Sequence, residues 1–159
     1  MSLNSQGKIQ NVKASLEKYI YNKLVILEGF SVDFEGFPFE GTSSEEWIEE
    51  RILGKGVGDF HRQVSSSAIG QTVPILLNFN VFVDPNKTKR TNRHYEIRDI
   101  IANYFKIGTQ IDLYDASNGN WATSLQKMEV EEIATDRPIP DPNFHMYNFT
   151  VEISWLEQW

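Results

Sequence analysis

The sequence predicts a single α+β domain over residues 1–159, with a mixed, mostly antiparallel β-sheet and two α-helices packed on one face. The length suits one domain that buries its own core. Apolar residues recur with the helical period in two segments and alternate with period two in several others. Strands and helices do not alternate regularly, as parallel βαβ units require. The expected order of elements is therefore α-β-β-β-α-β-β-β.

An amphipathic helix is expected near the start of the chain, with Ser5 as a candidate N-cap. The apolar residues of its buried face are Ile9, Val12, Leu16, Tyr19 and Ile20. A short strand at 30–34 and a second strand at 47–53 follow, separated by an aromatic-rich turn. This part of the chain therefore supplies the first helix and the first two strands.

The segment at about 54–71 loses all periodicity and is rich in glycine and serine, so we expect a flexible loop. Loops in compact domains usually have about 4–6 residues, so a loop of this length is either functional or disordered. Phe60, His61 and Arg62 are too apolar and too specific for a mere spacer. We therefore expect these three residues to contact a partner.

The most informative segment runs from Thr72 to Phe105 and predicts a strand followed by a helix. Alternate residues from Ile75 to Val83 are apolar, as in a half-buried strand, and Asp84-Pro85-Asn86 ends it. Thr91 or Asn92 can cap the helix that follows. The buried face of this helix comprises Ile97, Ile100, Ile101 and Tyr104. The strand and the helix must pack together, so this unit should form about half of the core.

Further strands are expected at 110–114, 125–130 and 147–155, and Asn118-Gly119 is a hairpin signal. The segment 137–142 contains three prolines, so it must be extended and cannot enter a central sheet. The face of the sheet turned away from the helices carries polar residues on its best strands. That face should therefore meet solvent or another subunit.

Composition argues against several functional classes. The chain contains no cysteine, which excludes disulfides, thiolate chemistry and Cys-ligated metals. No apolar run approaches the roughly 20 residues that span a bilayer, and no signal peptide opens the chain, so we expect an unexported protein that does not bind a membrane. The net charge of −7 argues against specific nucleic-acid binding.

The search for a catalytic site finds none, so we expect no enzyme activity, no cofactor and no bound metal. The three histidines show no metal-ligand spacing. The segment Gly54–Gly58 lacks the Gly-Lys-Ser/Thr of a phosphate-binding loop. Neighbouring glutamates, such as Glu49 and Glu50, are interpreted as a solvated edge, because acid–base pairs need two different environments.

The charge distribution is more informative. Lys87, Lys89, Arg90 and Arg93 crowd the turn and the start of the second helix. One interpretation is simple solubility; another is a docking patch for acidic groups. Those groups would be DNA phosphates or the acidic segment 40–50, with Glu45 and Glu46, on another copy of the chain. Two different complementary patches make a heterologous contact, which can close into a ring.

These features together resemble the tail terminator (tail completion, minor tail) proteins of long-tailed bacteriophages and prophages. The resemblance lies in the order of features: an N-terminal helix, aromatic residues from Phe34 to Phe39, Trp47 opening a strand, and a Gly-rich loop with Arg62 that leads to Gly70. The strand–helix unit and a final hairpin and strand follow. The resemblance covers nearly the whole chain.

The resemblance implies a virion structural protein that assembles as a hexameric ring on the last ring of the tail tube. Such a ring stops tube growth and presents the surface for head joining. Its implied partners are further copies of itself, the tail-tube protein and a head-completion or connector protein. It would be located in the virion tail and assembled in the bacterial host cytoplasm. The alternatives are another neck or minor tail component of related fold, or a small-molecule-binding or enzymatic domain with a pocket at Phe37, Phe39 and Trp47.

Overall fold

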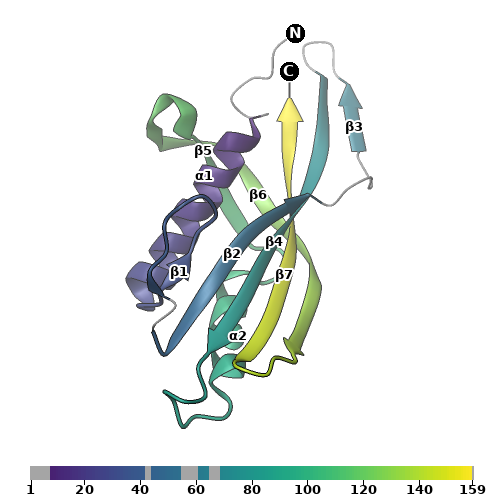
Figure 1. Cartoon of the computed structure of the whole chain (residues 1–159). Coiled ribbons are helices and arrows are strands. Elements are labelled where there is room, and N and C mark those ends of the chain that lie inside the picture. Colours follow the sequence, from purple (N-terminus) through teal and green to yellow (C-terminus); the bar gives the residue numbers. More distant parts are fainter. Residues whose placement is uncertain (1–7, 42–43, 55–60, 65–68, 159) are drawn as a thin grey trace.

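A helical segment opens the described chain, and a strongly twisted sheet follows it (Figure 1). The computed structural model describes residues 8–41, 44–54, 61–64 and 69–158. The two longer helices are α1 (Ile9–Ile20), continued by the π-helical η2 (Tyr21–Leu27), and α2 (Arg93–Tyr104). The described strands are β1 (Val32–Asp33), β2 (Glu46–Gly54), β3 (His61–Val64), β4 (Ile69–Val83), β5 (Gln110–Asp115), β6 (Asn120–Ile139) and β7 (His145–Gln158), with a short 3₁₀ turn, η4 (Ala116–Asn118), before β6.

The strands form one mixed sheet in the order β1-β2-β4-β7-β6-β5, with β3 paired to β4. The two residues of β1 run parallel to β2, and the other described pairs are antiparallel. The expected α+β class is confirmed, and so is a mixed, mostly antiparallel sheet. The sheet has one strand more than expected, because β3 falls in the segment predicted to be a loop.

Helix α1 lies against one face of the sheet through a regular apolar stripe. Val12, Leu16, Ile20 and Leu24 have no exposed surface. This stripe confirms the predicted helix, but the helical segment runs further than expected, to Leu27. It stops where Gly29 takes a positive φ of 76°, a conformation that suits glycine at a helix C-terminus.

Strand β4 and helix α2 form the centre of the core, as predicted. Every second residue of the strand from Ile75 to Val83 is buried, and on the helix Ile97 and Ile101 have no exposed surface. Ile100 and Tyr104 are partly buried and pack at the margin of this core. Asn92 is the N-cap residue of α2, but its side chain makes no capping hydrogen bond.

The opposite face of the sheet is more covered than the sequence suggested. Asn148 donates hydrogen bonds to the side-chain oxygens of Asn78 (2.7 Å) and Asn80 (2.8 Å), and Thr150 donates to Asn78 (2.8 Å). Asn148 and Thr150 are both buried. A cross-strand ladder of amides and hydroxyls therefore satisfies this face, which is not open to solvent along its centre.

Aromatic residues cover one end of the same face. Trp47 stacks on Phe82 with ring centroids 4.9 Å apart, and Phe144 meets Trp47 edge-on at 5.3 Å. Trp47 is therefore nearly buried. It belongs to a small packed cluster with Phe82 and Phe144.

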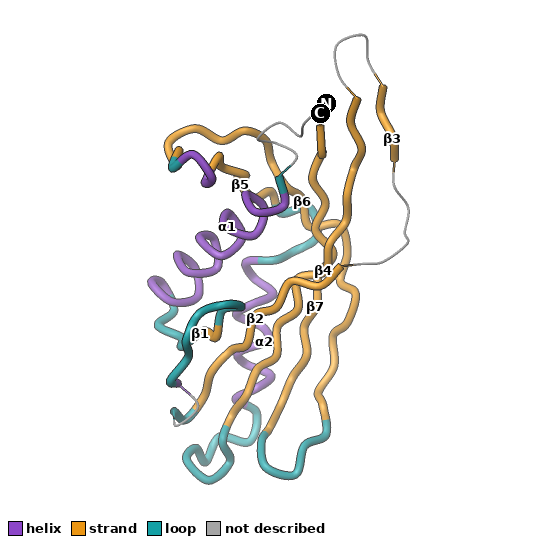
Figure 2. The backbone as a smooth tube through the Cα atoms, turned by 45° about the horizontal axis from the view of Figure 1, so that its top comes forward, coloured by secondary structure: helices purple, strands orange, loops and turns teal. Residues whose placement is uncertain are grey.

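The predicted flexible loop at about 54–71 is partly β-structure. Residues 61–64 form β3, which pairs with residues 69–72 of β4, whereas residues 55–60 and 65–68 lie outside the described part. We call the described backbone of residues 61–64 and 69–74 the hairpin arm. It projects beyond the end of β2, which stops opposite Ile75 (Figure 2). The prediction of a loop was wrong for residues 61–64, because a strand of four residues between stretches rich in glycine and serine is too short to show a period-two pattern.

Strand β6 extends into the segment that the prolines were expected to keep out of a central sheet. Arg137, Pro138 and Ile139 pair with β7, but β5 pairs with β6 no further along than Glu129. This stretch of β6 is therefore a sheet edge among the described strands, which is where proline is tolerated.

Candidate partner-binding surfaces

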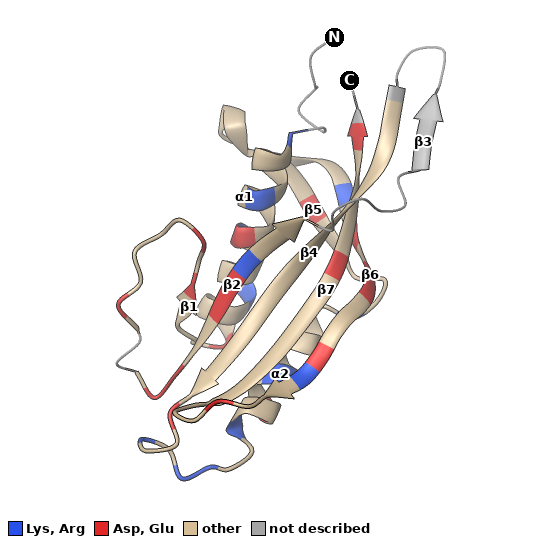
Figure 3. Ribbon diagram, turned by 45° about the vertical axis from the view of Figure 1, so that its right-hand side comes forward, with Lys and Arg blue, Asp and Glu red and all other residues tan. Residues whose placement is uncertain are grey.

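The basic turn and the acidic start of β2 meet within one chain. Figure 3 shows the cations of the turn between β4 and α2 beside acidic residues. Arg93 donates from Nε and Nη2 to the two carboxylate oxygens of Glu46, at 2.8 Å each. Arg90 pairs with Glu96, and Lys87 lies 3.8 Å from an oxygen of Asp84. The bidentate ion pair between Arg93 and Glu46 is therefore intramolecular.

This arrangement changes the charge hypothesis. Hydrogen bonds with Glu46 raise the pKa of Arg93, and those donated by Arg90 and Arg93 lower the pKa of Glu96. Arg93 and Glu46 are thus already paired and are poorly suited to join two copies. Lys89 and Glu45 are exposed and lack an ion pair among the described residues, so they remain accessible to a partner.

The three predicted contact residues of the loop are only partly placed. Phe60 lies outside the described residues. His61 and Arg62 open β3, and their backbone partners are Thr72 and Gln71 of β4. The arm therefore presents these positions on a strand, away from the charged turn below α2 (Figure 1).

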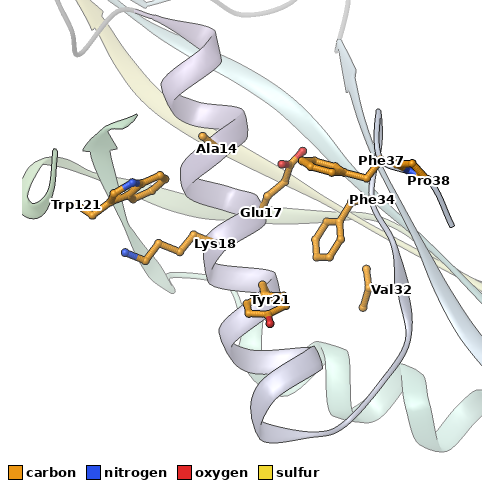
Figure 4. Close-up of a pocket in the computed structure, with 9 residues that line it drawn as sticks. All are labelled: Ala14, Glu17, Lys18, Tyr21, Val32, Phe34, Phe37, Pro38 and Trp121. Atoms are coloured by element: carbon orange, nitrogen blue, oxygen red, sulfur yellow. The ribbon is translucent and has the colours of Figure 1, made fainter. Parts of the chain in front are cut away.

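An apolar groove runs between α1 and the segment that contains β1 (Figure 4). Its volume is about 650 Å³. The residues that line it are Ala14, Glu17, Lys18, Tyr21, Val32, Phe34, Phe37, Pro38 and Trp121. Of the three aromatics predicted for a pocket, Phe37 lines this groove, whereas Phe39 and Trp47 are not among its lining residues.

The cations beside the groove are engaged by neighbouring side chains. The ammonium of Lys18 lies 4.4 Å from the ring centroid of Trp121 and 5.0 Å from that of Tyr114. Lys13 pairs with Glu17 and donates to the carbonyl oxygen of Glu35 at 3.3 Å. The groove is therefore an apolar surface with polar groups confined to its rim, the usual composition of a binding site.

Glu50 is an unusual buried acid behind this region. It has no exposed surface, and neither carboxylate oxygen has a hydrogen-bond partner among the described residues. Burial, and then the charge of Glu17, raise its pKa to about 7. The interpretation of Glu49 and Glu50 as one solvated edge is wrong, because β2 turns Glu50 toward the core and leaves Glu49 half-buried on the other face.

Two histidines lie close together under the N-terminus of α2, although the sequence suggested that they were isolated. The ring centroids of His94 and His145 are 5.2 Å apart, beside a hollow of about 290 Å³. His94 is buried, and burial together with His145 lowers its pKa. No cluster of three or more His, Cys, Asp or Glu that could hold a metal ion occurs among the described residues.

No helix within the described ranges is long and apolar enough to cross a membrane. No family model matches the chain, and no curated protein matches it. One solved structure, whose description names no function, has the same fold with a TM-score of 0.64 and 10% identity, covering 93% of this chain and 95% of that chain. A chain from the virion of a native gene transfer agent particle has a TM-score of 0.52 and 11% identity over the same shares. At these identities the likeness shows a shared fold over nearly the whole chain.

Proposed function

We propose that this protein is a structural component of a phage or prophage virion, and specifically a tail terminator. In this role it caps the tail tube as a ring and forms the surface to which the head joins. The observation that carries the proposal is the fold likeness to a chain of the gene transfer agent virion, over 93% of this chain and 95% of that one. The order of sequence features, which resembles tail terminators, supports the same role.

The proposed ring consists of six copies joined head to tail. Its further partners are the tail-tube protein on one side and a head-completion or connector protein on the other. It is assembled in the host cytoplasm and resides in the virion tail. The proposal includes no catalytic step and no cofactor. The surfaces that support it are the exposed Lys89 and Glu45, the hairpin arm and the apolar groove.

The decisive experiment adds the purified protein to tail tubes made without a terminator. A terminator is expected to stop tube growth at native length and to allow heads to attach, both visible by electron microscopy. The ring released from the ends of the capped tubes should have a mass of about 110 kDa by native mass spectrometry, six times the 18.4 kDa of one chain. Tubes that keep growing in its presence contradict the proposal. If tube length is unaffected but heads fail to attach without it, another neck or minor tail component is the better assignment.

The groove favours one alternative from a different class, a small-molecule-binding or enzymatic domain. An apolar groove near an acid of raised pKa is a common form of ligand site. This alternative predicts a monomer whose melting temperature rises with a metabolite, and whose Phe37→Ala variant loses that response. A protein that assembles on tail tubes and responds to no metabolite excludes it.

A further inference from the structure

We propose that the groove between α1 and residues 32–38 receives the hairpin arm of a second copy of this chain, so that neighbouring copies join head to tail. This inference rests on the proposed ring and names the surfaces that would build it. Three observations carry it: the exposure of the groove, the charge around it, and the place of the arm on the molecule.

The groove exposes more aromatic surface than an isolated protein usually leaves in water. Phe37 is 60% exposed, Tyr21 is 48% exposed and Trp121 is 38% exposed. All three lie on its walls, with Phe34 beside Phe37 at a ring-centroid distance of 6.5 Å (Figure 4). Rigid aromatic side chains gathered on a concave apolar surface are typical of the centre of a protein–protein interface.

The charge around the groove selects a basic occupant. Residues 34–40, which supply one wall of the groove, include Glu35 and Glu40 and no lysine or arginine. On the other wall Glu17 is paired with Lys13, and Lys18 lies over the rings of Tyr114 and Trp121. The arm, residues 61–64 and 69–74, contains Arg62 and no acidic residue. An apolar and basic segment is the complement of an apolar groove with acidic surroundings.

The arm is placed so that it can reach a neighbour. Strand β4 continues for six residues beyond the last pairing of β2, opposite Ile75, which is roughly 20 Å at the rise of a β-strand. Among the described strands, β3 pairs with β4 and with no other. In both views the arm extends beyond the end of β2, away from α1 and β1 (Figures 1 and 2).

The arm and the groove are two different surfaces of one molecule, so a contact between them is heterologous. Such a contact, repeated through a fixed rotation, generates a closed ring. Within the arm, β3 pairs with β4 and with no other described strand, so a contact through β3 leaves the pairing of β4 with β7 intact. The geometry therefore supplies the head-to-tail joint that the proposed ring needs.

The absence of cysteine from the chain makes a direct test possible. One preparation carries Phe37→Cys and an affinity tag, and a second, untagged, carries Arg62→Cys or Gln63→Cys. Adjacent positions of a strand sample its two faces, so the two arm variants cover both orientations. After mixing at high concentration and mild oxidation, a disulfide-linked species of about twice 18.4 kDa is expected between Phe37→Cys and one arm variant.

The matched control is Ile107→Cys, because Ile107 is 64% exposed, close to the 60% of Phe37, but is not among the residues that line the groove. It should give little adduct with either arm variant. Phe37→Ser, at an exposed position, should weaken assembly while leaving the melting temperature unchanged.

Native mass spectrometry of the same mixtures distinguishes failure of the arm-to-groove contact from failure of the tail terminator proposal. Rings without any arm-to-groove adduct above the control overturn the docking inference and leave the terminator proposal standing. Predominant linkage of Phe37→Cys to itself indicates a two-fold contact and also overturns the inference. If no oligomer forms in solution or on tail tubes, both proposals are wrong.

Discussion

The two halves of strand β4 lie in contrasting environments. From Ile75 to Val83 the strand is paired with β2 on one side and β7 on the other, and its inward residues are buried beneath the helices. From Ile69 to Pro74 its partners are β3 and β7, outside the helical layer. The first half is the centre of the core, whereas the second half is a projecting arm.

Pro74 lies at the boundary between these halves. Pairing with β2 ends opposite Ile75 and pairing with β3 begins opposite Thr72, so Pro74 falls where neither strand is paired. A residue without an N–H donor is tolerated at that point, because no ladder hydrogen bond is required of it on that side. One continuous strand thus serves two purposes: its inner half stabilises the fold, and its outer half is available for contact.

The largest effect expected from this comparison is on stability in the inner half. Phe79→Ala removes a fully buried ring and should lower the free energy of unfolding by about 3–5 kcal/mol. Ile101→Ala on the facing helix should cost about 2–5 kcal/mol for the same reason. Thr72→Ala in the arm, as the matched control, should change it by no more than about 0.5 kcal/mol. Urea denaturation measures all three, and equal losses would show that the arm belongs to the core.

The inner half could be predicted from the sequence because its signal is strong. Ile75 to Val83 alternates over nine residues and the helix beyond repeats at 3.6, so face and partner both follow from pattern. The arm could not be predicted, since its first strand has four residues between stretches of glycine and serine. A period-two pattern shows which face of a strand is buried, and in the arm Gln71, Thr72 and Val73 are all only partly buried.

The candidate sites were harder to predict for a different reason. The sequence suggested that the acidic and basic segments are complementary, but it does not distinguish a partner in the same chain from one in another copy. Arg93 and Glu46 are 47 residues apart and meet because β2 begins opposite the end of β4. Glu50 was missed because neighbouring glutamates suggest a solvated edge, whereas alternation along β2 places Glu49 and Glu50 on opposite faces.

The second largest effect concerns pH and also belongs to the inner half, where Glu50 lies opposite Phe79. Its pKa is about 7 in the fold against 4.5 ordinarily, so the folded state binds the proton more tightly. Stability from this group is therefore full below pH 4.5 and is lost as the pH rises through about 7, by about 3 kcal/mol.

Glu50→Gln should remove this loss, so the variant should be more stable than the wild type at pH 8 and should show no such difference at pH 4. Thermal unfolding monitored by circular dichroism at both values measures it. Glu49→Gln, on the half-buried opposite face, is the control and should leave the pH dependence unchanged. A wild-type pH profile that survives Glu50→Gln would show that another group is responsible. His94 is not a candidate, because its lowered pKa makes stability rise with pH.

A smaller effect is expected at the far end of the inner half, where Glu46 pairs with Val83 and its carboxylate meets Arg93. The side chains of both residues are about one-fifth exposed, and the contact is bidentate. A double-mutant cycle with Glu46→Ala and Arg93→Ala should give a coupling energy of about 1 kcal/mol, reduced by salt. The cycle should give the same value at concentrations that favour the monomer, because the pair is intramolecular. A coupling that disappears on dilution would instead place the partner on another copy.

The smallest effect on stability, and the largest on assembly, is expected in the arm. Replacing residues 57–67 with a Gly-Ser linker removes β3, which pairs with β4 and with no other described strand. The melting temperature should remain nearly unchanged, since the buried core lies elsewhere. Native tail length and ring formation should both be lost, because the arm is then unable to dock on its partner. The control keeps the loop length and restores β3 alone, His61 to Val64, inside the linker. Recovery of assembly in that control would assign the contact to the strand, and wild-type tails in phage carrying the full replacement would reduce the arm to a simple connector.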